Sequence, residues 1–566
     1  MREIMTIQVG DFANFVGSHF WNFQDELLGL AGHRCSDPIF SNQSLDMDVL
    51  YRTGETPQGI LTYTPRLLSV DLPGSLGSMS SQGTLYNEPS PTSSSVCTWT
   101  GNVSTHVSEP CKKNLFLQRL QEDDQESPAL IGVENGKNDC KSDISDNDVV
   151  ESLDRSVQFW TDFSKVHFHP LNLFELNGIG VDTQNFKSHA IGKDELLGIM
   201  QVEEMNERLR FFVEECDHIQ GIQLLVDDSG SYSFVAADFL ENIADEYANT
   251  PLLLFSLRGP RNYINTEDHK QMIVRNLRDA VSFSRLSSFS SLIVPVGLPN
   301  LSSSKASRFH CMKSENPYHC SAVYASALHS ISLPFRMELP HPTAHPYNVH
   351  GGIDVNGIVQ VLTGQARQSS VAVLDVSMPA PSLIGTQFEH SVLNSLQPLT
   401  PEVADDLEDL LAVESLTILG ALESELNRAS VSKVKEAVHS AYEHSTHKPK
   451  SSHLSVSRCP LPIPLPFPPI FGNLLSSRMP GSSSRGLLDV CSIPIATRLR
   501  SSMSALPFLE NRLGYLRRHG IDRGGLGREV ASGWGFERDE LVVMEENLLK
   551  MVRELQPGSD MSSGSD

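Results

Sequence analysis

Two short loops of this sequence stand where an α/β protein would bind the phosphates of a nucleotide. Each follows an apolar, strand-like run and precedes a helix-like segment, and their sequences are "GDFANFVG" and "DDSGSY". Phosphate binds at such places because backbone N–H groups converge at a helix N-terminus or at a glycine-containing turn. The residues that could take part are Gly10, Asp11 and Asn14 in the first loop, and Ser229, Gly230 and Ser231 in the second.

The side chains of both loops are poorly suited to this chemistry. In the first loop, the Asp11 carboxylate would repel phosphate unless a metal ion bridged them, and Phe12 is bulky where the backbone must approach closely. In the second loop, Gly230 is the only glycine, and Asp227 and Asp228 precede it. We therefore favour structural turns over a working phosphate site, with Asp11 as the N-cap of a helix.

The sequence supports a metal centre or a hydrolytic nucleophile less than it supports a phosphate site. His341, His345 and His350 form a local histidine cluster, and prolines at 342 and 346 break the helix that zinc ligands at this spacing would need. We favour a loop without metal. The sequence has no G-x-S-x-G motif, and its nine cysteines include no C-x-x-C pair. A hydrolase that uses the three histidines is the alternative, and a zinc analysis would test it.

Strand and helix patterns alternate around the two loops. Residues 2–9 alternate loosely as a strand does, and apolar residues at helical spacing follow from Phe12 to Phe23. Further strands are predicted at Tyr63–Leu72, Ile219–Val226, Leu252–Leu257 and Ser291–Val296, and helices at Met200–Cys216, Phe234–Tyr247 and Met272–Leu286. This order predicts an α/β fold with a parallel sheet and helices on both of its faces.

The remaining segments are less regular. Residues 121–154 hold eleven acidic and two basic residues, which predicts a solvated, disordered insertion between core segments 1–120 and 155–340. For residues 341–555 we predict a C-terminal region of helices and proline-rich linkers, with helices at Leu407–Leu426 and Leu541–Leu555. Residues 460–469 contain six prolines and are predicted to be extended polyproline outside the core. Residues 556–566 form a disordered tail by composition.

Composition excludes several classes of function. The 566-residue chain has 44 basic and 69 acidic residues, a net charge of −25, which disfavours direct binding to nucleic acid or to anionic lipid. The N-terminus lacks the apolar core of a secretory signal, and the uncharged stretches are too rich in serine or proline to be transmembrane helices. Scattered cysteines fit a reducing compartment. We therefore expect a cytoplasmic protein without a transmembrane segment.

Several segments together resemble tubulin, and more closely the tubulin-related Misato family. The tubulin-like segments are "MREIMTIQVGDFANFVGSHFW", "YTPRLLSVDLPGSL" and "ECDHIQGIQLL". Those closer to Misato are "DVLYRTG", "TYTPRLLSVDLPGSL", "FVEECDHIQGIQ" and "HCSAVYASALHSISLPFRM". They cover most of residues 1–340 and are specific as a set. The resemblance implies a tubulin-like α/β fold.

The resemblance also implies where a nucleotide would lie. It adds Asp71 and Gly74, in the turn after the Tyr63–Leu72 strand, to the candidate nucleotide-binding residues. The tubulin loop GGGTGSG is matched here by "SGSYSFV", in which only Gly230 keeps its glycine. Asp11 replaces a glutamine that faces the phosphates, the glutamate before Pro-Gly is absent, and no N-x-D-E loop is present near residues 325–337. We expect a vestigial site, no required cofactor and at most weak GTP binding.

The function that the resemblance implies is a non-enzymatic factor in mitochondrial distribution, morphology or inheritance, and in microtubule assembly. We expect a scaffold whose protein partners are tubulin, chaperonin or proteins of the mitochondrial outer surface, the last of which could hold it at the outer membrane. The alternative is a GTP-binding protein or GTPase with a rebuilt site, in which Asp11, Asp71, Asp227 and Asp228 hold Mg²⁺ near the phosphates.

Overall fold

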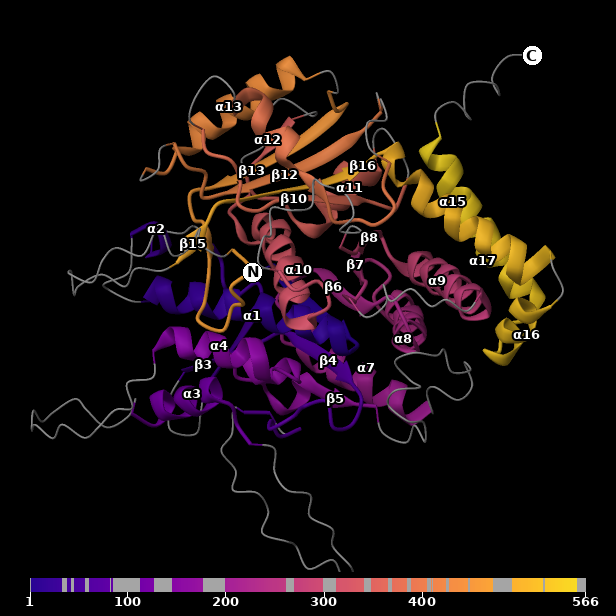
Figure 1. The fold of residues 1–566 in the computed structure, drawn as a ribbon, viewed down its shortest axis with the longest axis horizontal. Helices are drawn as coiled ribbons and strands as arrows, with labels where there is room; N and C mark the ends of the chain where they lie inside the picture. The colour runs from indigo at the N-terminus through magenta and orange to yellow at the C-terminus, as the bar shows by residue number, and fades with distance from the viewer. Residues whose placement is uncertain are drawn as a thin grey trace, which may run out of the picture.

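The protein contains the predicted parallel sheet, which has six strands (Figure 1). The computed structural model describes residues 2–32, 38–41, 45–55, 61–81, 83–84, 112–126, 145–176, 199–260, 269–298, 312–339, 348–364, 369–383, 388–404, 409, 411–423, 427–445, 448–471, 491–522 and 525–556. The strand order is β5-β4-β1-β6-β7-β8, with bounds β1 Glu3–Val9, β4 Leu67–Asp71, β5 Leu173–Glu175, β6 Ile219–Asp227, β7 Leu252–Leu257 and β8 Leu292–Val296. Val9 pairs with Val70 and with Val226, so β1, β4 and β6 end side by side.

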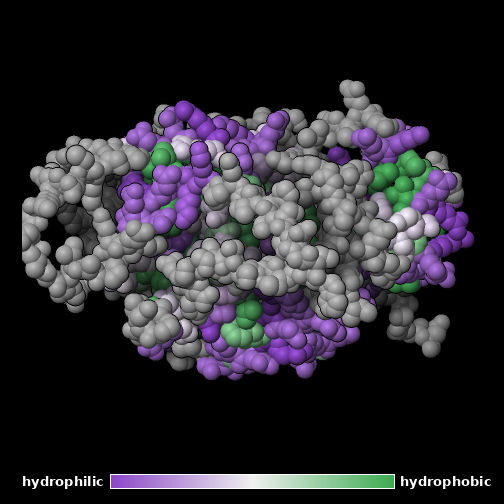
Figure 2. Space-filling view, turned by 90° about the horizontal axis from the view of Figure 1, so that it is seen from below, coloured by the Kyte–Doolittle hydropathy of each residue, from purple (hydrophilic) through white to green (hydrophobic). Residues whose placement is uncertain are grey.

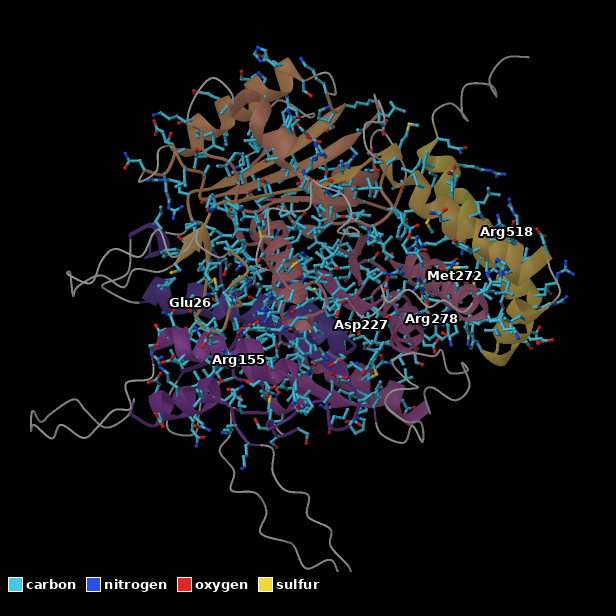
Figure 3. All side chains as sticks on the ribbon, in the orientation of Figure 1. Glu26, Arg155, Asp227, Met272, Arg278 and Arg518 are labelled. Carbon is cyan, nitrogen blue, oxygen red and sulfur yellow. The ribbon has the colours of Figure 1, made fainter. Side chains whose placement is uncertain are left out.

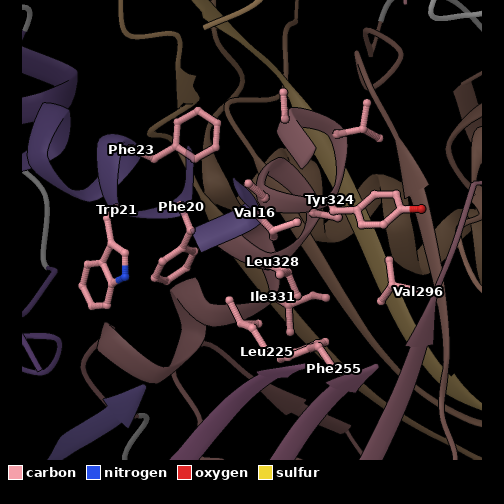
Figure 4. Packing of buried hydrophobic residues seen from close by; sticks show 14 of the residues in the cluster. Val16, Phe20, Trp21, Phe23, Leu225, Phe255, Val296, Tyr324, Leu328 and Ile331 are labelled. Atoms are coloured by element: carbon pink, nitrogen blue, oxygen red, sulfur yellow. The ribbon is translucent and has the colours of Figure 1, made fainter. Parts of the chain in front are cut away.

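Helices cover both faces of this sheet, as predicted. The packing on one face comes from α1 (Asp11–Gly32) and α10 (Pro317–Ser332), whose side chains meet strand residues such as Leu225 and Phe255 (Figure 4). The other face is covered by α7 (Ile199–Glu214), α8 (Tyr232–Glu246) and α9 (His269–Phe289). In β1, Met5, Ile7 and Val9 belong to the core on the side of α7, α8 and α9, and Ile4 belongs to the core on the side of α1 and α10. Thr6 and Gln8, which alternate with the first group, are buried polar residues.

A second six-stranded sheet, which the sequence did not predict, lies beyond α10. Its order is β11-β10-β16-β12-β13-β9, with bounds β9 Asn348–His350, β10 Val373–Ser377, β11 Gln397–Pro398, β12 Val413–Leu419, β13 Ser451–Ser457 and β16 Ile495–Ser501. The sheet is mixed, since β16 runs antiparallel to both of its neighbours while β12 and β13 are parallel. On its outer side lie α12 (Phe388–Ser395) and α13 (Val431–His444), and α11 (Val355–Thr363) packs on the side that faces the first sheet (Figure 1).

The predicted helix at 407–426 is therefore wrong in its centre, where the chain forms β12. All seven residues of this strand are buried. Its apolar residues are interrupted by Glu414, Ser415 and Thr417, and their spacing alone does not separate this strand from a helix.

The C-terminal helices form a layer outside α8 and α9. This layer consists of α15 (Leu506–Tyr515), η6 (Leu516–Asp522), α16 (Leu526–Gly533) and α17 (Arg538–Leu555), shown in yellow in Figure 1. The structure confirms the helix that we predicted at Leu541–Leu555. Its buried residues, which include Leu541, Leu548 and Leu555, join the same core as Leu277 of α9.

Smaller elements correct two further predictions. The Tyr63–Leu72 strand is divided at Arg66 into β3 (Leu61–Pro65), which pairs with β2 (Tyr51–Glu55), and β4. Residues 460–469 are not outside the core, because Leu461 and Phe467 are buried and β14 (Leu461–Pro462) pairs with β15 (Ser492–Ile493). The other short elements are α2 Pro38–Ser41, η1 Trp160–Phe163, η2 Pro170–Asn172, η4 Leu333–Arg336 and η5 Met503–Ala505.

The acidic segment is ordered at both ends. It includes the end of α3 (Leu115–Glu126) and most of α4 (Asp146–Ser156), and Val149 and Leu153 of α4 are buried in the core. The prediction of a solvated insertion is therefore wrong for these helices, because apolar residues four apart give α4 one buried face. The centre of the segment, and residues 557–566 of the tail predicted at 556–566, lie outside the described residues, and the predicted domain limits stay predictions.

Candidate functional site

The predicted site residues gather at the carboxyl ends of β1, β4 and β6. Gly10, Asp11 and Asn14 lie where β1 enters α1, Asp71 ends β4, and Gly74 follows it in a turn. Ser229, Gly230 and Ser231 connect β6 to α8, and Ser231 is fully buried. We call these three loops, together with Asp227, the nucleotide edge, and Figure 3 labels Asp227 in the interior beside α8. The structure thus brings together the residues that the sequence singled out.

The N-terminus of α1 is capped by a side chain from another loop. Asp227 accepts hydrogen bonds from the backbone N–H groups of Phe12 at 3.1 Å and Ala13 at 2.7 Å. These are the donors that a bound phosphate would use at a helix N-terminus. Asp11 is the first residue of α1, and Gly10 accepts the first helical hydrogen bond from Asn14 N–H. The prediction of Asp11 as N-cap is therefore wrong, and Asp227 provides the cap.

Gly10 is needed for this arrangement. Its φ is +114°, and a Cβ at this position would lie 2.5 Å from Cγ of Asp227. The glycine therefore serves the close approach of an internal carboxyl group. Burial first, and the nearby charge of Asp11 second, raise the pKa of Asp227 well above its ordinary value.

A second carboxyl group, Asp71, is held by three donors. Its oxygens accept hydrogen bonds from Tyr232 Oη at 2.6 Å, from Leu72 N–H at 2.8 Å and from Asn14 Nδ2 at 3.1 Å. Burial, and next the charge of Asp11, raise the pKa of Asp71 to about 6, although these hydrogen bonds oppose the shift. Asn14, one of the predicted nucleotide-binding residues, joins α1 to β4 through this hydrogen bond.

Tyr232, the first residue of α8, is buried directly after the loop that connects β6 to α8. It is 1% exposed, it packs with the apolar residues beneath the sheet, and its hydroxyl group reaches Asp71. Gly230 has a φ of +71°, so this position keeps a glycine because the turn requires one. A large side chain two residues later occupies space where a phosphate loop would keep small residues.

A carboxylate also accepts a backbone hydrogen bond from the turn after β4. Gly74 has a φ of +82°, and its backbone N–H donates to Glu175 Oε1 at 3.1 Å. Two of the three loops therefore direct backbone donors at acidic side chains of the same chain. Neither Glu175 nor the role of Asp227 was predicted.

The alternative of a magnesium site is not supported by the geometry. Asp228 forms an ion pair with Arg258 at 2.8 Å, and Arg258 also binds Asp279 at 2.9 Å. Asp71 and Asp227 use their oxygens for the contacts described above. Within the described part of the chain, no group of three or more His, Cys, Asp or Glu side chains is arranged to hold a metal ion. Burial is the main cause of the raised pKa of Asp227, and Asp11 and Asp71 lie close enough to add to it, whereas Asp228 is paired with Arg258.

Only one of the three histidines of the predicted cluster lies among the described residues. His350 ends β9 at the edge of the second sheet, while His341 and His345 lie outside the described residues. A nearby histidine, His453, is buried and is bound to Gly351 O at 3.0 Å and to Ser415 Oγ at 2.8 Å. These contacts are structural.

Together, fold and site define a tubulin-like α/β protein whose nucleotide edge is filled by its own side chains. Comparisons with known proteins agree with this class. The family description "Misato Segment II tubulin-like domain" matches residues 2–122, and "Tubulin domain" matches residues 151–337.

The relatives of the chain narrow the class. It is 30% identical to Protein misato homolog 1 of mouse (Mus musculus) over 99% of both chains. It is 28% identical to the zebrafish (Danio rerio) protein of the same name over 88% of both. It is also 28% identical to Protein misato of Drosophila melanogaster, over 59% of this chain and 60% of the relative. The chain belongs to the Misato family. No helix among its described residues is both long enough and apolar enough to cross a membrane.

Proposed function

We propose that this protein is a non-enzymatic, tubulin-shaped scaffold that acts in mitochondrial distribution, morphology or inheritance and in the assembly of tubulin into microtubules. The observation that carries the proposal is the pair of hydrogen bonds from Phe12 and Ala13 to Asp227. A triphosphate would have to displace this buried cap, and it would meet the charge of Asp11 at the same place. Breaking such a cap costs about 0.5–2 kcal/mol before any ligand contact is made.

The partners in this proposal are proteins. Tubulin, chaperonin and proteins of the mitochondrial outer surface are the candidates, and the protein acts from the cytoplasm, held at the outer membrane through a partner. The net charge of −25 supports a protein partner over nucleic acid. Membership of the Misato family supports the link with tubulin-like assemblies.

The first test is GTP binding by the purified full-length protein with Mg²⁺, by calorimetry, together with analysis of nucleotide released on denaturation. We expect no binding at millimolar GTP and no co-purified nucleotide. The matched variant is Asp227→Ala, which frees the two N–H groups of α1. Micromolar binding by the wild type that is lost in Asp227→Ala would contradict the proposal and favour the GTP-binding alternative.

The cellular role needs a separate test. In cells depleted of the protein, mitochondrial distribution and microtubule regrowth would be measured after re-expression of the wild type or of Asp71→Asn. Since the proposed role needs no nucleotide cycle, the variant should restore both. A variant that folds normally but restores neither would contradict a role without nucleotide.

A further inference from the structure

A buried arginine without a carboxylate partner lies just after α10, against α1. Arg336 ends η4 and is 1% exposed, and its Nη1 donates to Gln24 Oε1 of α1 at 2.5 Å. Among the residues that the structure describes, its Nε and Nη2 have no hydrogen-bond partner and no carboxylate forms an ion pair with it. On the face that Figure 2 shows, the described residues are largely hydrophilic, so charged groups there are hydrated, whereas Arg336 is enclosed by protein.

The charge of Arg336 persists at neutral pH. Burial lowers the pKa of its guanidinium group to about 10, which still leaves the group protonated at pH 7. A buried charge without an opposite charge is costly, and charged groups inside proteins are normally paired. Two acidic groups lie in this region, and neither neutralises the arginine. Asp25 pairs with Lys165 at 3.3 Å, and Cys459 Sγ donates to the backbone carbonyl oxygen of the next residue at 3.5 Å, as a protonated thiol does.

Further buried donors lie near the guanidinium group. Because Gln24 accepts from Arg336 through its oxygen, its amide nitrogen donates to Nδ1 of His329, at 2.9 Å. The ring proton of His329 is therefore on Nε2, which has no partner in the described structure. The same holds for the hydroxyl group of Tyr51 and the indole N–H of Trp21, whose ring centroids are 5.7 Å apart. The charge of Arg336 acts on both His329 and Tyr51, so we call these three residues the donor cluster.

We propose that the donor cluster binds one small inorganic anion of the size of chloride. A guanidinium group, an imidazole N–H and a phenol hydroxyl group all donate hydrogen bonds, and the guanidinium group supplies the opposite charge. Arg336, His329 and Tyr51 are each 1% exposed, so the site is closed to a nucleotide or a protein segment. A bound anion would neutralise Arg336 and would join α1, α10 and β2 at one point.

This inference goes beyond the proposed scaffold role. The donor cluster contacts the second half of α1 through Gln24, which lies ten residues after Asn14 of the nucleotide edge. Anion binding there does not depend on whether the nucleotide edge binds GTP.

The test compares urea unfolding of the full-length protein in sodium chloride and in sodium gluconate, at equal ionic strength and pH 7. Gluconate is too large for a closed site and serves as the reference anion. We expect chloride to stabilise the wild type, and above the dissociation constant each tenfold rise in chloride should lower the equilibrium constant for unfolding about tenfold. Arg336→Met, which removes the charge, should lose this response.

Two tyrosine variants provide an independent comparison. Tyr51→Phe removes one donor and should move the response to higher chloride, so it reports on the site even if Arg336→Met does not fold. The matched control is Tyr318→Phe, because Tyr318 is also 1% exposed but its hydroxyl group donates to Pro466 O at 2.6 Å. This control should keep the wild-type response to chloride. A response that is unchanged in Arg336→Met or in Tyr51→Phe would overturn the proposal, and internal water would then hydrate Arg336.

A crystal of the full-length protein grown in sodium bromide gives a direct measurement, because bromide scatters anomalously. We expect an anomalous difference peak within hydrogen-bonding distance of Arg336 Nη2. Peaks only at the protein surface would contradict an internal anion site.

Discussion

At the scale of single residues, the nucleotide edge is occupied by carboxyl groups of the chain itself. Asp227 receives two N–H groups of α1, and Glu175 receives that of Gly74. The N–H groups of Phe12 and Ala13 are buried donors that would otherwise need water or a ligand, whereas that of Gly74 is exposed. Any anion that entered would therefore have to replace contacts that hold the loops together, at about 1–3 kcal/mol for each donor that is left without a partner.

The raised pKa of Asp71 gives a prediction for pH. Because its pKa is about 6 in the folded protein and about 3.9 when unfolded, the folded state binds this proton more tightly. Ionisation therefore lowers stability as the pH rises from about 4 to about 6. We expect the difference in unfolding free energy between Asp71→Asn and the wild type to move in favour of the variant over this range, by about 2 kcal/mol, measured by urea unfolding.

Asp245, which is exposed on α8, provides the control for this measurement. Asp245→Asn should follow the wild type at every pH within about 0.5 kcal/mol. Tyr232→Phe removes a donor that lowers the pKa of Asp71, so it should extend the pH-dependent range upward. A flat difference curve for Asp71→Asn would mean that this carboxyl group titrates as it does in water.

Which residues gather at the edge could be predicted from sequence, but their roles could not. Gly10, Asp71 and Gly230 follow strands of one parallel sheet, so their meeting follows from the alternation of elements. The partners of Asp227 lie more than 200 positions away along the chain, and those of Gly74 lie about a hundred. No local pattern shows that a carboxyl group will fill an anion site from such a distance.

At the scale of elements, hydrogen bonds of Asp154 in α4 connect the acidic segment to the core. Asp154 accepts from Lys313 Nζ at 2.5 Å and from Nε2 of the buried His319 at 2.5 Å. The other ring nitrogen, Nδ1, accepts from Lys313 N–H at 3.2 Å, so Nε2 carries the proton. Although burial alone would raise it, these donors hold the pKa of Asp154 below its ordinary value.

Removing this link should loosen α4. We expect Asp154→Ala to lower the unfolding free energy by about 1–3 kcal/mol, because the His319 N–H is left buried without an acceptor. Hydrogen exchange in α4 should rise in the same variant. Glu151→Ala, on the same helix, removes only an exposed ion pair with Arg155 and should cost less than about 0.5 kcal/mol. Equal effects of the two variants would contradict a specific role for Asp154.

The prediction of helices and strands succeeded where the spacing of apolar residues was regular over a long segment. The strands β1, β6, β7 and β8 and the helices between them follow the predicted bounds closely. The second sheet was not predicted because its strands pair with partners that are distant in the sequence. Arg498 and Arg500 of β16, for example, point at Asp375, which lies more than a hundred residues earlier. When only the neighbouring sequence is considered, charged residues of this kind indicate a solvent-exposed surface.

At the scale of the whole molecule, the C-terminal helices form an outer layer that packs on α8 and α9 and buries part of their surface. Leu548 of α17 is 0% exposed, whereas Val543 on the same helix is 55% exposed. We expect Leu548→Ala to cost about 2–5 kcal/mol and to raise hydrogen exchange in α9, which α17 covers. Val543→Ala should change stability by less than about 0.5 kcal/mol. Similar costs for both would mean that α17 does not pack as described.

The position of β16 has a consequence for the order in which this protein can be made. The strand lies between β10 and β12, yet it is translated more than a hundred residues after β10. At ordinary ribosomal speed the earlier strands wait on the order of ten seconds for their central neighbour, with apolar faces uncovered. The helices α15 and α17, which cover α9, are synthesised after β16. A nascent chain of this topology has a prolonged need for protection during synthesis, although the finished protein buries these surfaces.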